Sequence, residues 1–286
     1  MFCFGFASSG APLQNQTKMR FNACVNHEAS KGAYTQTHAN RYKRTFQWLC
    51  QQHPVVLDAT ANKPLDVLVL GGGTGAFETC LSRVVPMTLH TYEGDLSYPY
   101  CSLANQSMDL VTSCEVLEHL KDQTTRGISA HWQATGVFNH LMEISRVLRP
   151  GGRALITTPN LGSWDNIRAM LHGKSPFLFP PHVRELTRRE VEYLMSQAGL
   201  AAHLQVETVD TYGKTSTPPA GLHMSAGKYG LDHHKTTTFA IGGPSRVVPG
   251  SLFDRPLGLW KKKIAIKLPG SDQVLPPGML GKRDCS

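Results

Sequence analysis

The chain has 286 residues, 41% of them hydrophobic, and a formal net charge of +8. This length suits one sizeable domain with extensions, and no apolar run approaches the roughly 20 residues that a membrane-spanning helix needs. The apolar start, residues 1–7, is short and lacks a basic segment, so it predicts a loose arm rather than a signal peptide. The positive charge permits acidic or nucleic-acid partners, but much of it is spread along the chain.

The cysteines predict a reducing compartment. There are seven of them, an odd number, and none forms a CxxC pair. This pattern disfavours a disulfide framework and a cysteine zinc site. We therefore expect a cytoplasmic protein.

The predicted organisation has three parts. Residues 1–33 are polar without clear periodicity and are predicted to be an N-terminal arm. The main domain is predicted over 34–242 and opens with a helix over 34–53, which ends just before Pro54. Residues 243–286 are punctuated by proline and glycine and are predicted to be a C-terminal extension.

A glycine-rich turn follows the first predicted strand, 66–70. It reads Gly71-Gly72-Gly73-Thr74-Gly75, and a helix is predicted from about 74 to 83. A buried parallel strand that ends in such a turn brings a helix N-terminus to a ligand, and glycine lets the ligand approach the backbone. The glycine spacing fits both the dinucleotide fingerprint and the loop that holds S-adenosylmethionine.

Strands and helices alternate over the rest of the domain, which predicts a parallel α/β sheet. Further strands are predicted over 87–92, 108–113, 153–158, 204–210 and 236–241, and helices over 138–148 and 187–198. The last of these helices opens with a capping box, Thr187 with Glu190.

A second motif, Glu115-x-x-Glu118-His119, comes just after the strand 108–113. In a helix, spacings of three and four residues place all three side chains on one face. Two carboxylates and an imidazole on one face form a partial metal site or an acid/base cluster. His182, directly before the capped helix, is a fourth candidate.

In order and spacing, the glycine turn and the segments 109–120 and 143–160 resemble the class I S-adenosylmethionine-dependent methyltransferases. The resemblance spans about 34–241. It implies a Rossmann-like parallel sheet with an antiparallel edge hairpin and helices on both faces. It also implies S-adenosylmethionine as the cofactor, held by Gly71, Gly72, Gly73, Thr74, Gly75, Glu93, Asp95, Leu96 and Cys114. Glu93 lies 22 residues after Gly71, near the ~20-residue offset at which an acidic side chain binds ribose hydroxyls.

Two departures from the family stand out. Val69 occupies a position where the family commonly has an acid that helps to hold the amino group of the cofactor. Only thirteen residues separate Asp95 from Asp109, where the family normally fits another strand and helix. The role of that acid is therefore vacant or filled by another residue, and the chain is shortened between two strands.

The ExxEH motif with a later histidine is similar to two metal-dependent branches of the family. These are the ubiquinone-pathway O-methyltransferases and the enzymes that methylate the terminal ribose 2′-hydroxyl of small RNAs. The resemblance implies that Glu115, Glu118, His119 and His182 hold a divalent ion such as Mg²⁺ or Mn²⁺, which lowers the pKa of the acceptor hydroxyl. Without a metal, His119 or His182 is the natural general base.

These observations predict an enzyme that methylates a hydroxyl oxygen of a small molecule, such as a natural product, a quinone precursor or a sugar. One alternative is 2′-O-methylation of an RNA 3′ end. An alternative of another class is a catalytically silent scaffold that keeps the fold. A nicotinamide dehydrogenase could use the same glycine turn, but the downstream segments 109–119 and 146–160 argue against it.

Overall fold

The computed structural model describes residues 10–58, 60, 62–71, 75–98, 100, 102–121, 135–175, 181–211 and 236–245. The chain divides into two compact units, 1–245 and 246–286, and every described residue belongs to the first. Among these residues, no helix is both long enough and apolar enough to cross a membrane. The predicted domain boundaries at 34 and 242 stay predictions.

Helices and strands alternate through the described part of the chain. The helices are α1 (Gly10–Ala29), α2 (Ala33–Gln52), α3 (Ala76–Ser82), α4 (Thr135–Val147), α5 (Trp164–Leu171) and α6 (Arg188–Gln197), with short 3-10 helices η1 (Pro54–Asp58) and η2 (Leu117–His119). The strands are β1 (Leu65–Leu70), β2 (Met87–Thr91), β3 (Met108–Cys114), β4 (Leu148–Pro159), β5 (Ala202–Asp210) and β6 (Thr236–Gly243).

The six strands form one sheet in the order β2-β1-β3-β4-β6-β5. The first four strands of that order run parallel, and β6 pairs antiparallel with both β4 and β5. This arrangement confirms the predicted Rossmann-like parallel sheet with an antiparallel edge hairpin. Because β1 and β3 are adjacent and parallel, the glycine turn and the ExxEH motif leave the sheet side by side at its carboxyl edge.

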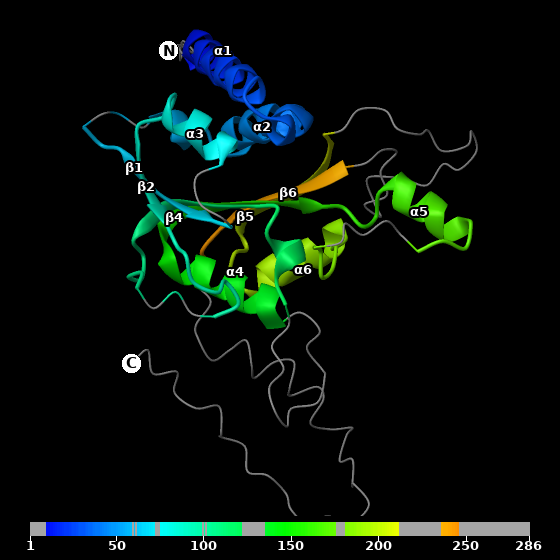
Figure 1. Ribbon diagram of the computed structural model, residues 1–286. Coiled ribbons are helices and arrows are strands. Elements are labelled where there is room, and N and C mark those ends of the chain that lie inside the picture. The colour runs from blue at the N-terminus through cyan, green and yellow to red at the C-terminus, as the bar shows by residue number, and fades with distance from the viewer. Residues whose placement is uncertain are drawn as a thin grey trace, which may run out of the picture. The chain divides into compact units, whose positions relative to one another are not determined.

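Helices cover both faces of the sheet (Figure 1). On one face, α1, α2 and α3 pack over alternate strand residues such as Val67, Leu110 and Phe239. On the other face, α4 and α6 pack over the intervening residues, such as Leu68 and Ile156. The alternation of strand side chains between two hydrophobic cores is what a sheet buried on both sides requires.

The connection between β2 and β3 is short, as the sequence predicted. Its described residues contain no helix and no strand. Arg146 of α4 holds this connection, because its guanidinium donates to the carbonyl oxygens of Leu103 at 2.8 Å and Tyr100 at 3.0 Å. The Tyr100 ring is fully buried in the hydrophobic core below this connection.

The structure differs from the sequence-based expectations at two places in the N-terminal part of the chain. Residues 10–29 of the predicted arm form the helix α1, which packs against α2 and α3. Cys24 of α1 and Cys80 of α3 form a disulfide, although the cysteine pattern predicted none. Tertiary packing brings these two residues together over a separation of 56 positions, and no local spacing rule reveals such a pair. The disulfide also weakens the argument for a reducing compartment.

Candidate functional site

The glycine turn begins with a residue whose conformation requires glycine. Gly71 has a φ of +100°, and a Cβ added there would lie 2.2 Å from Cγ2 of Val116. Gly75, at the other end of the turn, is the N-cap of α3. The predicted cofactor residues Gly72, Gly73 and Thr74 lie outside the described residues.

A cavity of about 590 Å³ opens beside this turn. Its walls come from α2, from the glycine turn with the start of α3, and from the segment that follows β3. The lining residues are Tyr34, Arg41, Tyr42, Val69, Leu70, Gly71, Gly75, Ala76, Phe77, Glu78, Leu96, Cys114, Glu115, Val116, His119 and Leu120. Four predicted cofactor residues are among them: Gly71, Gly75, Leu96 and Cys114.

The other predicted cofactor residues lie at the end of β2. Glu93 and Asp95 are exposed and do not line the cavity. The Asp95 carboxylate accepts a hydrogen bond from the backbone N–H of Ser97 at 2.8 Å, so it stabilises the turn. In the cavity wall, burial raises the pKa of the Cys114 thiol well above its usual range, which keeps this side chain neutral.

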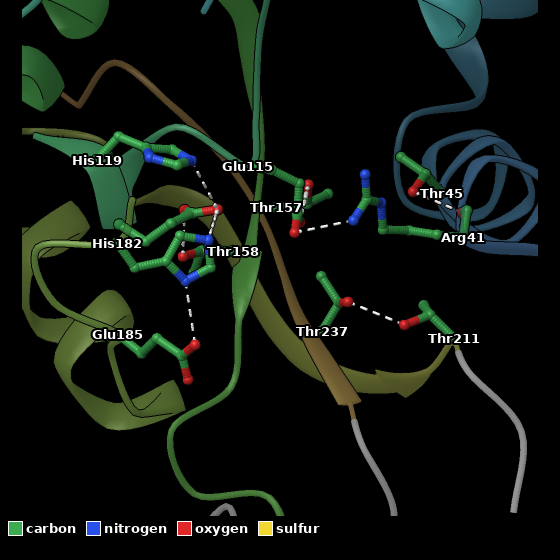
Figure 2. Close-up of polar contacts among 11 residues, drawn as sticks. Arg41, Thr45, Glu115, His119, Thr157, Thr158, His182, Glu185, Thr211 and Thr237 are labelled. Carbon is green, nitrogen blue, oxygen red and sulfur yellow. Dashed lines mark hydrogen bonds and ion pairs between the residues drawn. The ribbon is translucent and has the colours of Figure 1, made fainter. Parts of the chain in front are cut away.

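Glu115 turns away from the other two residues of its motif. It has a φ of +57°, and only Leu117–His119 form a helical turn, so the prediction of one shared helical face is wrong. Its carboxylate accepts hydrogen bonds from the Arg41 guanidinium at 3.0 Å and from the Thr157 hydroxyl at 2.9 Å (Figure 2). The ion pair with Arg41 joins α2 to the carboxyl edge of the sheet. Sequence reasoning missed Arg41, whose partner is 74 positions away.

Glu118, His119 and His182 converge instead. One ligand atom from each lies within 4.8 Å of the others. Glu118 is almost fully buried, and its Oε2 accepts a hydrogen bond from the Thr158 hydroxyl at 2.9 Å. Its Oε1 has no hydrogen-bond partner among the described residues and lies 4.0 Å from Nε2 of both His119 and His182. Three of the four predicted metal ligands are thus together, and Glu115 borders them.

The two imidazole rings are oriented by contacts on their opposite sides, and Figure 2 shows the one between His182 and Glu185. Nδ1 of His119 lies 3.1 Å from the carbonyl oxygen of Pro181, and Nδ1 of His182 lies 3.1 Å from the Glu185 carboxylate. A carbonyl and a carboxylate accept hydrogen bonds, so each Nδ1 carries the proton. In the neutral ring, Nε2 is then an acceptor, and both Nε2 atoms face Glu118.

The segment that carries His182 is held to η2 by its backbone. The N–H groups of Val183 and Arg184 both donate to the carbonyl oxygen of Glu118, at 2.7 and 3.3 Å. The predicted capping box then starts α6, with Thr187 and Glu190 donating and accepting reciprocally. These bonds bring His119 and His182, which are 63 positions apart in the sequence, into one cluster.

The electrostatics of the cluster favour a cation. Burial raises the pKa of the Glu118 carboxyl well above its usual range, and the negative charge of Glu115 raises it further. A positive ion beside Oε1 would stabilise the ionised carboxylate. One carboxylate oxygen and two imidazole nitrogens fit Mn²⁺, Co²⁺ or Zn²⁺ at least as well as Mg²⁺, which prefers oxygen ligands.

Comparison with known proteins decides the family. The sequence model of a family described as a methyltransferase domain matches residues 41–205, which is more than half of the chain. The chain belongs to the class I S-adenosylmethionine-dependent methyltransferases. This membership implies S-adenosylmethionine as the cofactor of the methyltransferase.

Individual relatives are more distant. A probable S-adenosylmethionine-dependent methyltransferase of Mycolicibacterium smegmatis is 33% identical over 111 residues, which are 39% of this chain. The match covers 33% of the length of that curated relative.

Solved structures of similar proteins align over most of this methyltransferase. A methyltransferase from Archaeoglobus fulgidus is 13% identical, with a TM-score of 0.45 over 70% of this chain and 93% of its own. The YcgJ protein from Bacillus subtilis is 14% identical, with a TM-score of 0.42 over 71% of this chain and 99% of its own. Similarity at this level carries no argument about the substrate.

The cavity suits the cofactor of the family. Its volume falls in the range of about 300–1,000 Å³ that is typical of small-molecule sites. Aromatic and aliphatic side chains such as Tyr42 and Leu96 line it together with the charged Arg41 and Glu78. S-adenosylmethionine combines an adenine ring, whose faces pack against apolar side chains, with a charged methionine end, so the mixed lining of the cavity matches its chemistry.

Proposed function

We propose that this methyltransferase transfers the methyl group of S-adenosylmethionine to a hydroxyl oxygen of a small molecule, at a site where Glu118, His119 and His182 hold a divalent ion. One observation carries the proposal: in the part of the chain that the structure describes, the buried Oε1 of Glu118 has no hydrogen-bond partner and faces the Nε2 atoms of both histidines. An unpartnered carboxylate oxygen in a buried position is costly, and a cation between these three atoms would offset that cost.

The reaction requires an acceptor oxygen beside the methyl donor. S-adenosylmethionine supplies an electrophilic methyl group on its sulfonium. The acceptor hydroxyl loses its proton to solvent, the new O–C bond forms as the S–C bond breaks, and S-adenosylhomocysteine leaves. When bound, a divalent ion lowers the pKa of a hydroxyl near it. His119 lines the cofactor cavity and belongs to the cluster, so the acceptor oxygen would lie between the two sites. Holding it there in line with the donor supplies much of the catalysis.

This arrangement supports a small-molecule hydroxyl as the acceptor. A cation held by three protein atoms keeps open positions for two neighbouring oxygens of an acceptor, such as those of a catechol or a sugar diol. The 2′-O-methylation of an RNA end would use similar chemistry, but no contact in the described residues favours RNA over a small molecule. The catalytically silent scaffold is also less favoured, because the cavity and the convergent cluster are both present.

A metal-free mechanism is the second candidate, and His119 supports it. Its imidazole is 42% exposed at the cavity, and its Nδ1 is held by the Pro181 carbonyl. The free Nε2 can therefore take the hydroxyl proton as the methyl group transfers. The Glu118 carboxylate would then stabilise the imidazolium that forms.

Metal titration calorimetry distinguishes the two candidates. The protein, saturated with S-adenosylhomocysteine, is titrated with Mn²⁺ and with Mg²⁺. We expect one Mn²⁺ to bind per chain, and we expect Glu118→Gln to weaken its affinity by about 100-fold, since a ligand that carries charge is lost. Catechol and phenol are then offered as acceptors, and methylation of catechol alone is expected.

The matched control is Glu192→Gln, which removes one carboxylate from an exposed position on α6. It should leave the Mn²⁺ affinity unchanged. Equal Mn²⁺ affinity of Glu118→Gln and the unmodified protein would contradict the metal site. Methylation in the presence of a chelator, lost in His119→Gln, would then support the histidine as a base.

A further inference from the structure

Glu78 is a second buried carboxylate of the site, and the metal cluster does not use it. It lies in the first turn of α3, just after the glycine turn, and its side chain lines the cofactor cavity. Only 6% of the residue is exposed. A carboxylate in such a position loses most of its hydration, and the charged form needs compensation from its surroundings.

The surroundings of Glu78 supply hydrogen bonds but no ion pair. The Thr112 hydroxyl donates to Oε1 at 3.4 Å, and the backbone of Gly75 and of Glu78 itself contributes further hydrogen bonds. Within the described residues, no nitrogen of a lysine, arginine or histidine lies within 4.0 Å of this carboxylate. The nearby Arg41 pairs with Glu115. Burial accordingly raises the pKa of the Glu78 carboxyl.

The position of this carboxylate relates it to the glycine turn. Thr112 of β3 is paired in register with Val69 of β1, so the two side chains lie on the same face of the sheet. Glu78 contacts Thr112 on that face. A Cβ added to Gly75 would lie 3.1 Å from Oε2 of Glu78, which puts the carboxylate directly against the turn.

We propose that Glu78 binds the α-ammonium group at the methionine end of S-adenosylmethionine. The group is a cation with three hydrogen-bond donors, and the buried carboxylate beside the turn is an acceptor without a cationic partner. Glu78 thus provides, from a helix, the acid that is absent at Val69 of the neighbouring strand. The positive charge of the ammonium group would then stabilise the ionised Glu78 carboxylate.

Calorimetric titration with two ligands tests this assignment. The first ligand is S-adenosylhomocysteine, which has the ammonium group but no sulfonium charge, and the second is the same molecule without its α-amino group. In the unmodified protein we expect the second ligand to bind at least tenfold more weakly, as the loss of a charged hydrogen bond predicts. In Glu78→Gln we expect the affinity for S-adenosylhomocysteine to fall by a similar factor. The two ligands should then differ in affinity by less than about threefold.

The second ligand controls for structural damage. If Glu78→Gln weakens both ligands by the same factor, the residue only supports the start of α3 and the assignment is wrong. Unchanged binding of both ligands would also overturn it. Glu192→Gln, the same substitution at an exposed position, should keep the discrimination of the unmodified protein. None of these outcomes bears on the acceptor or the metal, so the proposed function is tested separately.

A crystal structure of the unmodified protein with S-adenosylhomocysteine gives a readout that does not depend on the variant folding. We expect the ammonium nitrogen within about 3.2 Å of a Glu78 carboxylate oxygen, the usual limit for a hydrogen bond. An ammonium group that contacts only backbone carbonyl oxygens, with Glu78 beyond hydrogen-bond reach, would overturn the proposal.

Discussion

Two features of the Gly71 position exclude a side chain. Its φ of +100° lies in the left-handed region, and the space where a Cβ would stand is filled by a methyl group of Val116. Val116 lies in the segment after β3. The glycine therefore lets this segment pack directly against the turn after β1. The cavity that we assign to the cofactor opens beside this contact.

We predict that Gly71→Ala destabilises the protein by about 2 to 4 kcal/mol, from backbone strain and overpacking together. Gly151→Ala is the matched control, because Gly151 has a φ of +86° and nothing within 4 Å of an added Cβ. It should cost about 1 kcal/mol, from strain alone. Urea unfolding of both variants measures the difference. Equal losses would show that Val116 moves aside freely.

Glu115 shows how one backbone angle reassigns a motif. The spacing of Glu115, Glu118 and His119 predicted a common helical face, but the φ of +57° at Glu115 directs its carboxylate toward Arg41. Positive φ at a residue other than glycine costs free energy and persists only where contacts fix it. Here Arg41 and Thr157 fix it, and both are distant in sequence.

At the scale of elements, a buried hydrogen-bonded chain joins β3 to α4. His140 of α4 contacts the Tyr100 hydroxyl through Nδ1 at 2.5 Å and the Ser113 hydroxyl through Nε2 at 2.8 Å. All three residues are fully buried. Burial lowers the pKa of His140 to about 3, so the imidazole is neutral in the folded protein. The contact therefore makes the packing of α4 sensitive to acid.

We predict that His140 makes the fold less stable as the pH falls. The pKa of His140 is about 3 when folded, against an ordinary 6.5, so the unfolded chain binds more protons between these values. The contribution of this group is fully present above pH 6.5. It decreases by about 1.4 kcal/mol for each pH unit below that.

The measurement is the free energy of unfolding at pH 7 and pH 4.5, for the unmodified protein and for His140→Gln. Glutamine does not titrate and can still form hydrogen bonds. We expect the unmodified protein to lose about 2 to 3 kcal/mol more than the variant over this interval. Parallel pH profiles of the two proteins would mean that other groups cause the acid sensitivity.

At the scale of the whole described unit, α1, α2 and α3 form a layer over the face of the sheet where the cofactor cavity opens. The Phe21 and Phe46 rings stack at 4.0 Å between α1 and α2, and the Cys24–Cys80 disulfide joins α1 to α3. Because α3 follows the glycine turn, this cross-link also restrains the element that presents Glu78.

We predict that loss of the disulfide lowers the free energy of unfolding by up to about 4 kcal/mol, the value of the chain-entropy model for a loop of this length. Cys80→Ser is compared with Cys50→Ser, which removes a thiol that forms no disulfide. Guanidinium denaturation should show the loss for the first variant only. A stability of Cys80→Ser equal to that of the control would indicate that the two thiols are unpaired in solution.

The sequence by itself determined the sheet and predicted the carboxyl edge as the place of the site. Strand residues alternate between two buried faces, and few backbone conformations fit a glycine-rich turn after β1. Hydrophobic periodicity and turn residues are therefore sufficient to predict the strands and the turn. The start of α6 was also predictable, because its capping box involves only residues three positions apart. The helix α1 escaped prediction because its few apolar residues, such as Phe21 and Val25, are buried by packing on α2 rather than by a regular amphipathic pattern.

Only the tertiary structure decided which side chains meet at the site. Arg41 reaches Glu115 across 74 positions, and the backbone of the segment near His182 is hydrogen-bonded to Glu118. The buried carboxylate of Glu78, on α3, is positioned by a hydrogen bond from Thr112 on β3. Sequence spacing fixes directions only within one regular element, whereas a site at a sheet edge is assembled from several chain segments whose approach depends on packing.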